Sequence, residues 1–351
     1  MAFRSQIDRA ARQSVGAVFG RIAQWFPNNG LVKYLTKLEK EIALSFDQTG
    51  RLRALAPGQI SYLDVGARYG LPKHIAQYAE FFDCILVEPE QEEAKRLRGL
   101  GYQVVDKALG ARAGTARLNV TLQTGASSLR RPNQAVTHFL SDKAETDSAT
   151  KTNFEQRHTI VDVQEVGLTT VEALCQSRGA PFDLVKVDTQ GAEYEIVQGF
   201  GAFYPLLLNI EVSMVEYYMG QRTFYDIAQV LHARGYMMSS FDVTPSRPAA
   251  YQSPELTWPG LPLHGDVSFI PDWSRPQGRD LIAAREIPFA ALMAIFGMTD
   301  VLCYLLDNFP FREEQRIRAA LAIPVSGRFD PHGFVHRIPM RKTVHDSSLT
   351  A

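Results

Sequence analysis

The stretch Tyr62-Leu63-Asp64-Val65-Gly66-Ala67-Arg68-Tyr69-Gly70 predicts the edge of a parallel β-sheet at which a ligand binds. An apolar strand that starts at Ile60 delivers Asp64 at its carboxyl end, where the ligand crevice of doubly wound folds lies. Gly66 lets the backbone approach a ligand, and Gly70 allows close packing where the next helix begins. We expect that helix from Leu71 to Glu80. The alternative is an ordinary turn between a strand and a helix that contains glycine.

The spacing of these glycines indicates the kind of cofactor. A dinucleotide-binding turn reads G-x-G-x-x-G, whereas this chain has G-x-x-x-G preceded by an aspartate, which offers less backbone to hold a pyrophosphate. We therefore expect S-adenosylmethionine, with its amino-acid end over the turn that contains Gly66, Ala67 and Gly70. An NAD-dependent oxidoreductase is a less favoured alternative.

A second apolar strand, Asp83 to Val87, ends in Glu88. It follows the first strand by roughly 20 residues, the distance expected within a βαβ unit. Glu88 is thus placed to accept hydrogen bonds from both ribose hydroxyls of the cofactor, and its charge disfavours the 2′-phosphate of NADP. The alternative is a solvated charge at the end of a strand.

A third apolar strand, Phe182 to Val187, delivers Asp188, and Gly191 opens the helix after it. Together the pieces resemble the FkbM-type S-adenosylmethionine-dependent methyltransferases over roughly Ser61 to Pro271. The resemblance rests on D-V-G-x-x-x-G, Glu88-Pro89, Ala108-Leu109-Gly110, Ser127-Ser128-Leu129 and L-V-K-V-D-T-Q-G-A-E, in that order. The chain departs from the family at Arg68, where members often carry Asn, and at Thr189, where they carry a branched aliphatic residue.

This resemblance implies a Rossmann-like class I methyltransferase that modifies a hydroxyl of a saccharide or a secondary metabolite. It also places Ala108 and Leu109 in the cofactor site. The alternation of strands and helices independently predicts a doubly wound, mostly parallel α/β sheet, with strands Leu206 to Glu211, Tyr236 to Phe241 and Asp266 to Ile270. The last two should pair antiparallel, which agrees with a seven-stranded sheet whose final strand is reversed.

Two carboxylates are candidates for the chemistry. Asp188 and Glu211 end neighbouring predicted strands, so they can act as base and orienter towards an acceptor hydroxyl. Together they could instead hold a magnesium ion that acidifies the hydroxyl. A third interpretation gives Glu211 a purely structural role.

Other residues are candidates for acceptor binding or proton transfer. Lys186 lies in a buried strand and needs an acidic partner. Glu193 either binds acceptor hydroxyls or caps the amides at the start of its helix. The antiparallel return of the last strand should carry the loop from Asp242 to Gly265 over the crevice, which makes His264 a candidate base and Tyr251 and Trp258 candidate stacking surfaces. A loop without a role in binding or catalysis is the alternative.

The chain of 351 residues is 45% apolar, enough for one large core with extensions. We expect a helical N-terminal extension at 1–55, a methyltransferase domain at 56–275, and a helical C-terminal extension at 276–351 with a disordered tail. The run Ile287 to Met298 should be a buried interface helix, because it is too short to span a membrane. The polar segment Gln134 to Gln156 suggests a mobile loop or lid over the site.

The net charge of −1 gives no indication of nucleic acid as a partner. The partners that we expect are a small-molecule or glycan acceptor and, through the helical extensions, a second copy of the chain. Residues 1–26 suggest an amphipathic helix that docks on protein, with weak contact to a membrane surface as the alternative. Three scattered cysteines read as reduced residues of a cytoplasmic protein. A non-catalytic scaffold that binds S-adenosylmethionine remains the non-enzymatic alternative.

Overall fold

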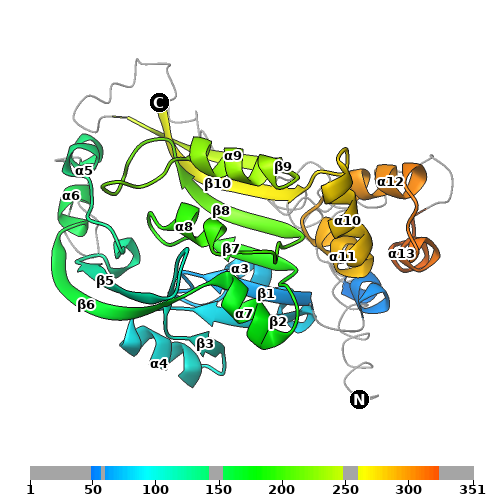
Figure 1. Cartoon of the computed structure of the whole chain (residues 1–351), viewed down its shortest axis with the longest axis horizontal. Coiled ribbons are helices and arrows are strands. Elements are labelled where there is room, and N and C mark those ends of the chain that lie inside the picture. Colours follow the sequence, from blue (N-terminus) through cyan, green and yellow to red (C-terminus); the bar gives the residue numbers. More distant parts are fainter. Residues whose placement is uncertain (1–48, 57–59, 142–152, 248–259, 324–351) are drawn as a thin grey trace, which may run out of the picture.

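The computed structural model describes residues 49–56, 60–141, 153–247 and 260–323, and its centre is a seven-stranded sheet in the order β3-β2-β1-β7-β8-β10-β9 (Figure 1). Strands β3, β2, β1, β7 and β8 pair in parallel, and β10 runs antiparallel to both β8 and β9. The doubly wound sheet with a reversed last strand is therefore confirmed. The strands are β1 (Ile60–Val65), β2 (Phe82–Val87), β3 (Gln103–Val105), β7 (Leu184–Val187), β8 (Leu207–Ser213), β9 (Tyr236–Ser246) and β10 (Leu261–Pro271).

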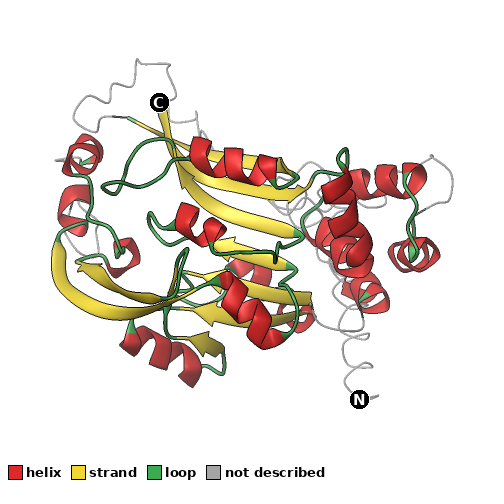
Figure 2. Ribbon diagram, viewed as in Figure 1, coloured by secondary structure: helices red, strands yellow, loops and turns green. Residues whose placement is uncertain are grey.

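Side chains that alternate along the strands fill two cores. Tyr62 and Leu184 belong to one buried cluster, whereas Leu63 and Val185 belong to the other. Because neighbouring residues of a strand point to opposite faces, the two clusters occupy opposite faces of the sheet. The helices associated with these strands are α3 (Lys73–Ala76), α4 (Gln91–Gly99), α7 (Val171–Arg178), α8 (Glu193–Gln198) and α9 (Phe224–Ala233), seen around the sheet in Figure 2.

A smaller three-stranded sheet, in the order β4-β6-β5, lies beside the main one (Figure 1). Its strands are β4 (Ala108–Leu109), β5 (Gly114–Thr121) and β6 (Ile160–Thr169). The sequence alternates as a strand only from Thr159 to Val163. Strand β6 is longer than this segment, because it pairs with β5 along nearly its whole length. Pairing with a strand that is distant in sequence thus extends β6 beyond the segment in which polar and apolar residues alternate.

Three expectations about local structure need correction. The helix from Leu71 to Glu80 is instead the short α3 followed by a 3₁₀ turn, η1 (Ala79–Phe81). The segment Gln134 to Gln156 is not simply a loop, since it contains α5 (Gln134–Leu140) and α6 (Phe154–Arg157), capped by Asn133 and Asn153. The loop from Asp242 to Gly265 is partly strand, because β9 and β10 continue to pair as far as Ser246 and Leu261.

Four helices follow the sheet: α10 (Pro276–Ala284), α11 (Glu286–Ile295), α12 (Thr299–Asn308) and α13 (Glu314–Leu321). Helix α11 is almost wholly buried and shares a core with Ile60, Leu184 and Leu207, which start three parallel strands. These helices therefore cover the amino-terminal edge of the sheet, on the right in Figure 1. No described helix is long and apolar enough to cross a membrane. The amphipathic stretch at 1–26 and the tail after Arg341 lie outside the described residues.

A buried ion pair ties the C-terminal helices to the strands. Asp183 accepts hydrogen bonds from Ser61 N at 3.0 Å and Ser61 Oγ at 2.7 Å. Its other oxygen lies 3.2 Å from Nη1 of Arg285, which stands between α10 and α11. Arg285 also donates to the carbonyls of Phe182 and Tyr204. One carboxylate thus joins β1, the start of β7 and the C-terminal helices.

We predict that Asp183→Ala lowers the free energy of unfolding by about 2 to 4 kcal/mol, because it leaves the Arg285 guanidinium buried without its partner. Urea denaturation monitored by circular dichroism measures the change. The control is Glu80→Ala, which breaks an exposed pair with Arg53 and should cost about 0 to 1 kcal/mol. Equal losses in the two variants would contradict the anchoring role of Asp183.

Candidate active site

A first cavity of about 610 Å³ opens at the carboxyl ends of β1, β2 and β7. Gly66 forms part of its wall with a φ of 83°. A Cβ at this position would lie 1.8 Å from the carbonyl oxygen of Asp188, so the turn after β1 can pass the end of β7 only as glycine. Ala108, Leu109 and Asp188 also line this cavity, together with Ser127 and Ser128.

Glu88 is the acidic residue placed most directly in the first cavity. Its side chain is 4% exposed, and Oε1 accepts a hydrogen bond from the Glu90 amide at 2.9 Å. Burial raises the pKa of Glu88 to about 7, although the Glu90 amide and the charge of Arg68 act in the opposite direction. Arg68, which also lines the cavity, forms an ion pair with Glu90.

Other residues predicted to bind the cofactor support this cavity without lining it. Asp64 is fully buried, and its Oδ1 lies 3.6 Å from Nζ of Lys186. Ala67 is buried in a cluster with Leu86 and Leu97, and Gly70 packs beside the Tyr102 ring. Asp64, Ala67 and Gly70 are predicted to contact the cofactor, but none of these three residues lines the first cavity. The alternation of side chains along β1 explains why Asp64 does not line the cavity. Asp64 points to the same face of the sheet as Tyr62, and the cavity lies on the other face.

A second cavity of about 730 Å³ lies next to the first. Among the residues that the structure describes, Gly125 and Gln190 are the two that line both cavities. The walls of the second cavity include Glu211 and Ser213 from β8 and His264 from β10, with Phe154 and His158 from the α6 segment, Tyr217, Tyr218 and Gln221. The two cavities thus meet beside Gln190.

The carboxyl groups of Asp188 and Glu211 are linked at this junction. Gln190 Nε2 donates to Asp188 Oδ1 and to Glu211 Oε2, each at 2.8 Å, and Lys186 Nζ lies 3.2 Å from Asp188 Oδ2. Burial favours the neutral form of Asp188, but the Lys186 charge and the bond from Gln190 outweigh it and lower the pKa. Burial and the nearby Asp188 charge raise the pKa of Glu211 well above its usual value. The pair therefore retains one proton more readily than two isolated carboxyl groups.

His264 lies on β10 and lines the second cavity. Its Nδ1 is 4.0 Å from Glu211 Oε1, and the Tyr217 ring packs edge-on against the imidazole with centroids 5.5 Å apart. Burial lowers the pKa of His264, although the Asp188 charge acts in the opposite direction. The lowered pKa favours the neutral imidazole, the form that can accept a proton. Tyr251 and Trp258, the other candidates from this part of the chain, lie outside the described residues.

The Glu193 carboxylate binds the loop that precedes its helix. Its carboxylate is 2% exposed and accepts hydrogen bonds from the amides of Thr189 and Gly191 and from the Thr189 hydroxyl. The amides of Thr189 and Gly191 lie before α8 rather than in it, and Glu193 also lines the second cavity, so the acceptor-binding interpretation of Glu193 stays a proposal. The contacts of Glu193 fix the loop between β7 and α8, which carries Gln190 into the junction.

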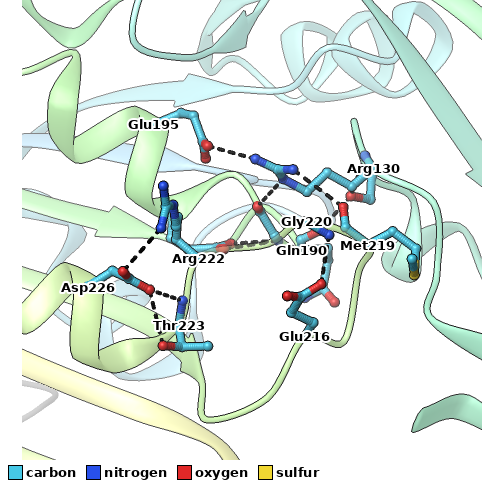
Figure 3. Close-up of polar contacts among 12 residues, drawn as sticks. Arg130, Gln190, Glu195, Glu216, Met219, Gly220, Arg222, Thr223 and Asp226 are labelled. Carbon is cyan, nitrogen blue, oxygen red and sulfur yellow. Dashed lines mark hydrogen bonds and ion pairs between the residues drawn. The ribbon is translucent and has the colours of Figure 1, made fainter. Parts of the chain in front are cut away.

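Arg130 joins three segments of the site and has no distinctive sequence pattern (Figure 3). Its guanidinium donates to Glu195 Oε1 at 2.6 Å, to the Gly191 carbonyl at 2.9 Å and to the Met219 carbonyl at 3.4 Å. Ser128 adds a hydrogen bond to the Gln190 carbonyl at 2.5 Å. The segment after β5 thus holds the loop after β7 against residues 216–220.

His158 also lines the second cavity, and no sequence pattern predicts this. Its Nδ1 lies 2.8 Å from the Phe154 carbonyl oxygen, which can only accept, so Nδ1 carries the proton and Nε2 keeps a lone pair. Burial lowers the pKa of His158, although the bond to Phe154 opposes this. Two histidines whose pKa burial lowers therefore line the second cavity, from segments far apart in the sequence.

Comparison with known proteins identifies the class of this chain. Residues 64–238 match the model of the methyltransferase FkbM domain. The chain belongs to the FkbM methyltransferases. The predicted family and the predicted enzyme class, an S-adenosylmethionine-dependent methyltransferase, are thereby confirmed. No curated protein sequence matches the chain significantly.

Solved structures give weak similarity to this FkbM methyltransferase. The plantazolicin methyltransferase BpumL in complex with SAH has a TM-score of 0.30 at 9% identity, covering 75% of this chain and 98% of that one. A putative methyltransferase from Thermoplasma acidophilum has a TM-score of 0.28 at 9% identity, covering 62% and 70%. A TehB-like methyltransferase from Corynebacterium glutamicum has a TM-score of 0.28 at 9% identity, covering 68% and 97%. The strand order above describes the fold independently of them.

We predict that His158 is a neutral Nδ1–H tautomer at pH 7, because its Nδ1 faces a carbonyl oxygen and burial disfavours the imidazolium. Long-range ¹⁵N–¹H correlation spectra of the labelled protein distinguish this tautomer from the Nε2–H form. His158→Phe removes the signals and assigns them. An Nε2–H or a doubly protonated ring at this pH would contradict the proposed lone pair in the second cavity.

Proposed function

We propose that this FkbM methyltransferase transfers a methyl group from S-adenosylmethionine to a hydroxyl of a saccharide or secondary metabolite. The observation that carries the proposal is the junction of the two cavities at Gly125 and Gln190, with a buried carboxylate in one cavity and a histidine in the other. The cofactor occupies the first cavity and the acceptor occupies the second. The methyl group passes between them beside Gln190.

The residues of the first cavity fit an adenosyl cofactor. Glu88 has Oε2 free of the Glu90 amide and can accept from ribose hydroxyls. Gly66 leaves room beside the strand end, and Ala108 and Leu109 offer an apolar wall to the adenine. Asp64, Ala67 and Gly70 contribute to binding by fixing the turn from below. The negative charge of Asp188, on the cofactor side, complements a sulfonium.

When bound, the cofactor supplies an electrophilic methyl group, and its sulfur keeps the bonding electrons as the acceptor oxygen forms the new bond. The protein must orient that oxygen and accept its proton. We assign the proton to His264, which lines the second cavity and whose pKa burial lowers. Glu211 orients His264 and the acceptor, while Asp188 stays ionised beside Lys186. Asp188 as the direct base is the second form of this proposal.

The groups that surround Asp188 and Glu211 favour proton transfer to a side chain over a magnesium ion that acidifies the hydroxyl. Oxygens of Asp188 and Glu211 already accept from Lys186 and Gln190, which bring one positive charge and one amide to the place where an ion would bind. Among the described residues, no group of three His, Cys, Asp or Glu side chains could hold a metal ion. Asp188 and Glu211 therefore do not fit a magnesium site as arranged.

The second cavity supports an uncharged, hydroxylated acceptor. Tyr217 and Tyr218 supply aromatic surface, and Ser213 with Gln221 supplies neutral hydrogen-bonding groups. Among the described residues, its charged or basic lining side chains are Glu193, Glu211, His158 and His264, with no lysine or arginine. Lys186 acts on the acceptor through Asp188, whereas Glu193 lines the second cavity itself and also fixes the loop that carries Gln190. Tyr251 and Trp258 remain proposed stacking surfaces.

The cofactor assignment predicts that S-adenosylmethionine binding tightens by up to about tenfold between pH 6 and pH 8, because Glu88, with a pKa of about 7, ionises in this range and the carboxylate is the better acceptor. Glu88→Gln should abolish this pH dependence. Glu88→Ala should weaken binding by about 1.5 to 3 kcal/mol at pH 8. Isothermal titration at several pH values measures both. A flat profile in the natural protein, or an unchanged dissociation constant in Glu88→Ala, would refute the assignment.

The catalytic assignment predicts that His264→Ala lowers kcat by about two to four orders of magnitude with little change in cofactor affinity. Asp188→Asn should also lower kcat, since it weakens the contacts with Lys186 and Gln190. Labelled S-adenosylmethionine and a panel of glycans and hydroxylated metabolites identify a substrate, on which the variants are compared. Full activity of His264→Ala would return the base to Asp188. Loss of activity on chelation, with recovery on adding magnesium, would replace the direct route by a metal site.

A further inference from the structure

Gln190 links two candidate catalytic carboxyl groups and lies where the cavities meet. Its Nε2 donates to Asp188 and Glu211 at equal distances of 2.8 Å. Asp188 lines the first cavity and Glu211 lines the second, whereas Gln190 lines both. One amide thus connects the cofactor side of the site with the acceptor side.

The backbone of Gln190 adopts an unusual conformation. Its φ of 58° lies in the left-handed region, which non-glycine residues seldom adopt unless the surroundings hold them there. Ser128 Oγ donates to its carbonyl, and Tyr218 Oη donates to its side-chain Oε1 at 3.0 Å. Both ends of the side-chain amide and the main-chain carbonyl are therefore engaged by different segments.

The chemistry of an amide suits this position. Two neighbouring buried carboxyl groups repel one another when both are ionised, and a second cation would neutralise them. A neutral NH₂ group offers a donor to each without adding charge, and its planar geometry fixes the two acceptors relative to one another. The Oε1 atom, held by Tyr218, determines which way the amide faces.

We propose that Gln190 is the positioning residue for methyl transfer, holding Asp188 towards the cofactor cavity and Glu211 towards the acceptor cavity and His264. The inference rests on the proposed function, which supplies the reaction being aligned. Gln190 itself need not exchange a proton. Its role is to keep two groups from neighbouring strands in the arrangement that the junction requires.

The test uses two substitutions in the full chain. Gln190→Gly removes the amide and suits the left-handed backbone, and Gln190→Leu removes the amide but keeps the side-chain volume. Carboxyl ¹³C signals of labelled Asp and Glu are followed against pH. Other charged or titratable groups affect the titration of Asp188 and Glu211. They are the same in all proteins compared: Asp64, Lys186, Glu193, Tyr218, His264 and Asp266.

In both variants we expect the pKa of Asp188 to rise, because its ionised form loses a donor, while S-adenosylmethionine affinity stays unchanged. On an identified acceptor, kcat should fall by about 10- to 100-fold with little change in KM, the signature of misalignment. Gln164→Leu is the matched control, since it removes an amide-to-carboxylate bond of 3.0 Å to Asp162 on exposed β6. It should change neither the Asp188 titration nor turnover.

Unchanged carboxyl titrations in a folded Gln190→Gly protein would overturn the positioning role. So would turnover equal to that of the natural protein in both variants, and in that case the proposed function stands. If the natural protein methylates no acceptor, the proposed function fails, while the titrations still decide whether Gln190 holds the two carboxyl groups.

Discussion

The approach of the turn after β1 to the end of β7 is the contact on which the site depends. Gly66 passes so close to the Asp188 carbonyl that any side chain would displace one of the two segments. The same approach brings the cofactor turn and the catalytic strand end to one cavity wall. Backbone sterics, rather than a charged interaction, thus set the distance between the turn after β1 and the end of β7.

Burial and neighbouring charges give the carboxyl groups of this site different pKa values. Lys186 lies between Asp64 and Asp188 and is the cation nearest to this acidic group. Burial raises the pKa of Asp64 and of Glu211, so the pocket disfavours a full set of negative charges. Asp188, in the first cavity, has a lowered pKa, whereas Glu211 and His264, in the second cavity, both favour their neutral forms.

The sequence predicts most of this fold because its strands carry their own signal. Apolar runs that end in Asp64, Glu88 and Asp188 identify the parallel strands and the edge where they finish. What it misses depends on contacts between distant segments. Strand β6 takes its length from β5, and the role of Gln190 comes from a left-handed backbone held by Ser128 and Tyr218. His158 enters the cavity through the short helix α6, which has no strong periodicity.

Helix α11 and its neighbours lie at the amino-terminal edge of the sheet, whereas both cavities open at the carboxyl edge. Much of the apolar burial is therefore separated from the acceptor cavity by the length of the strands. Substitutions far apart and without shared partners usually have additive effects on stability. The wall of the second cavity can thus accumulate substitutions without weakening the anchor formed by Asp183 and Arg285.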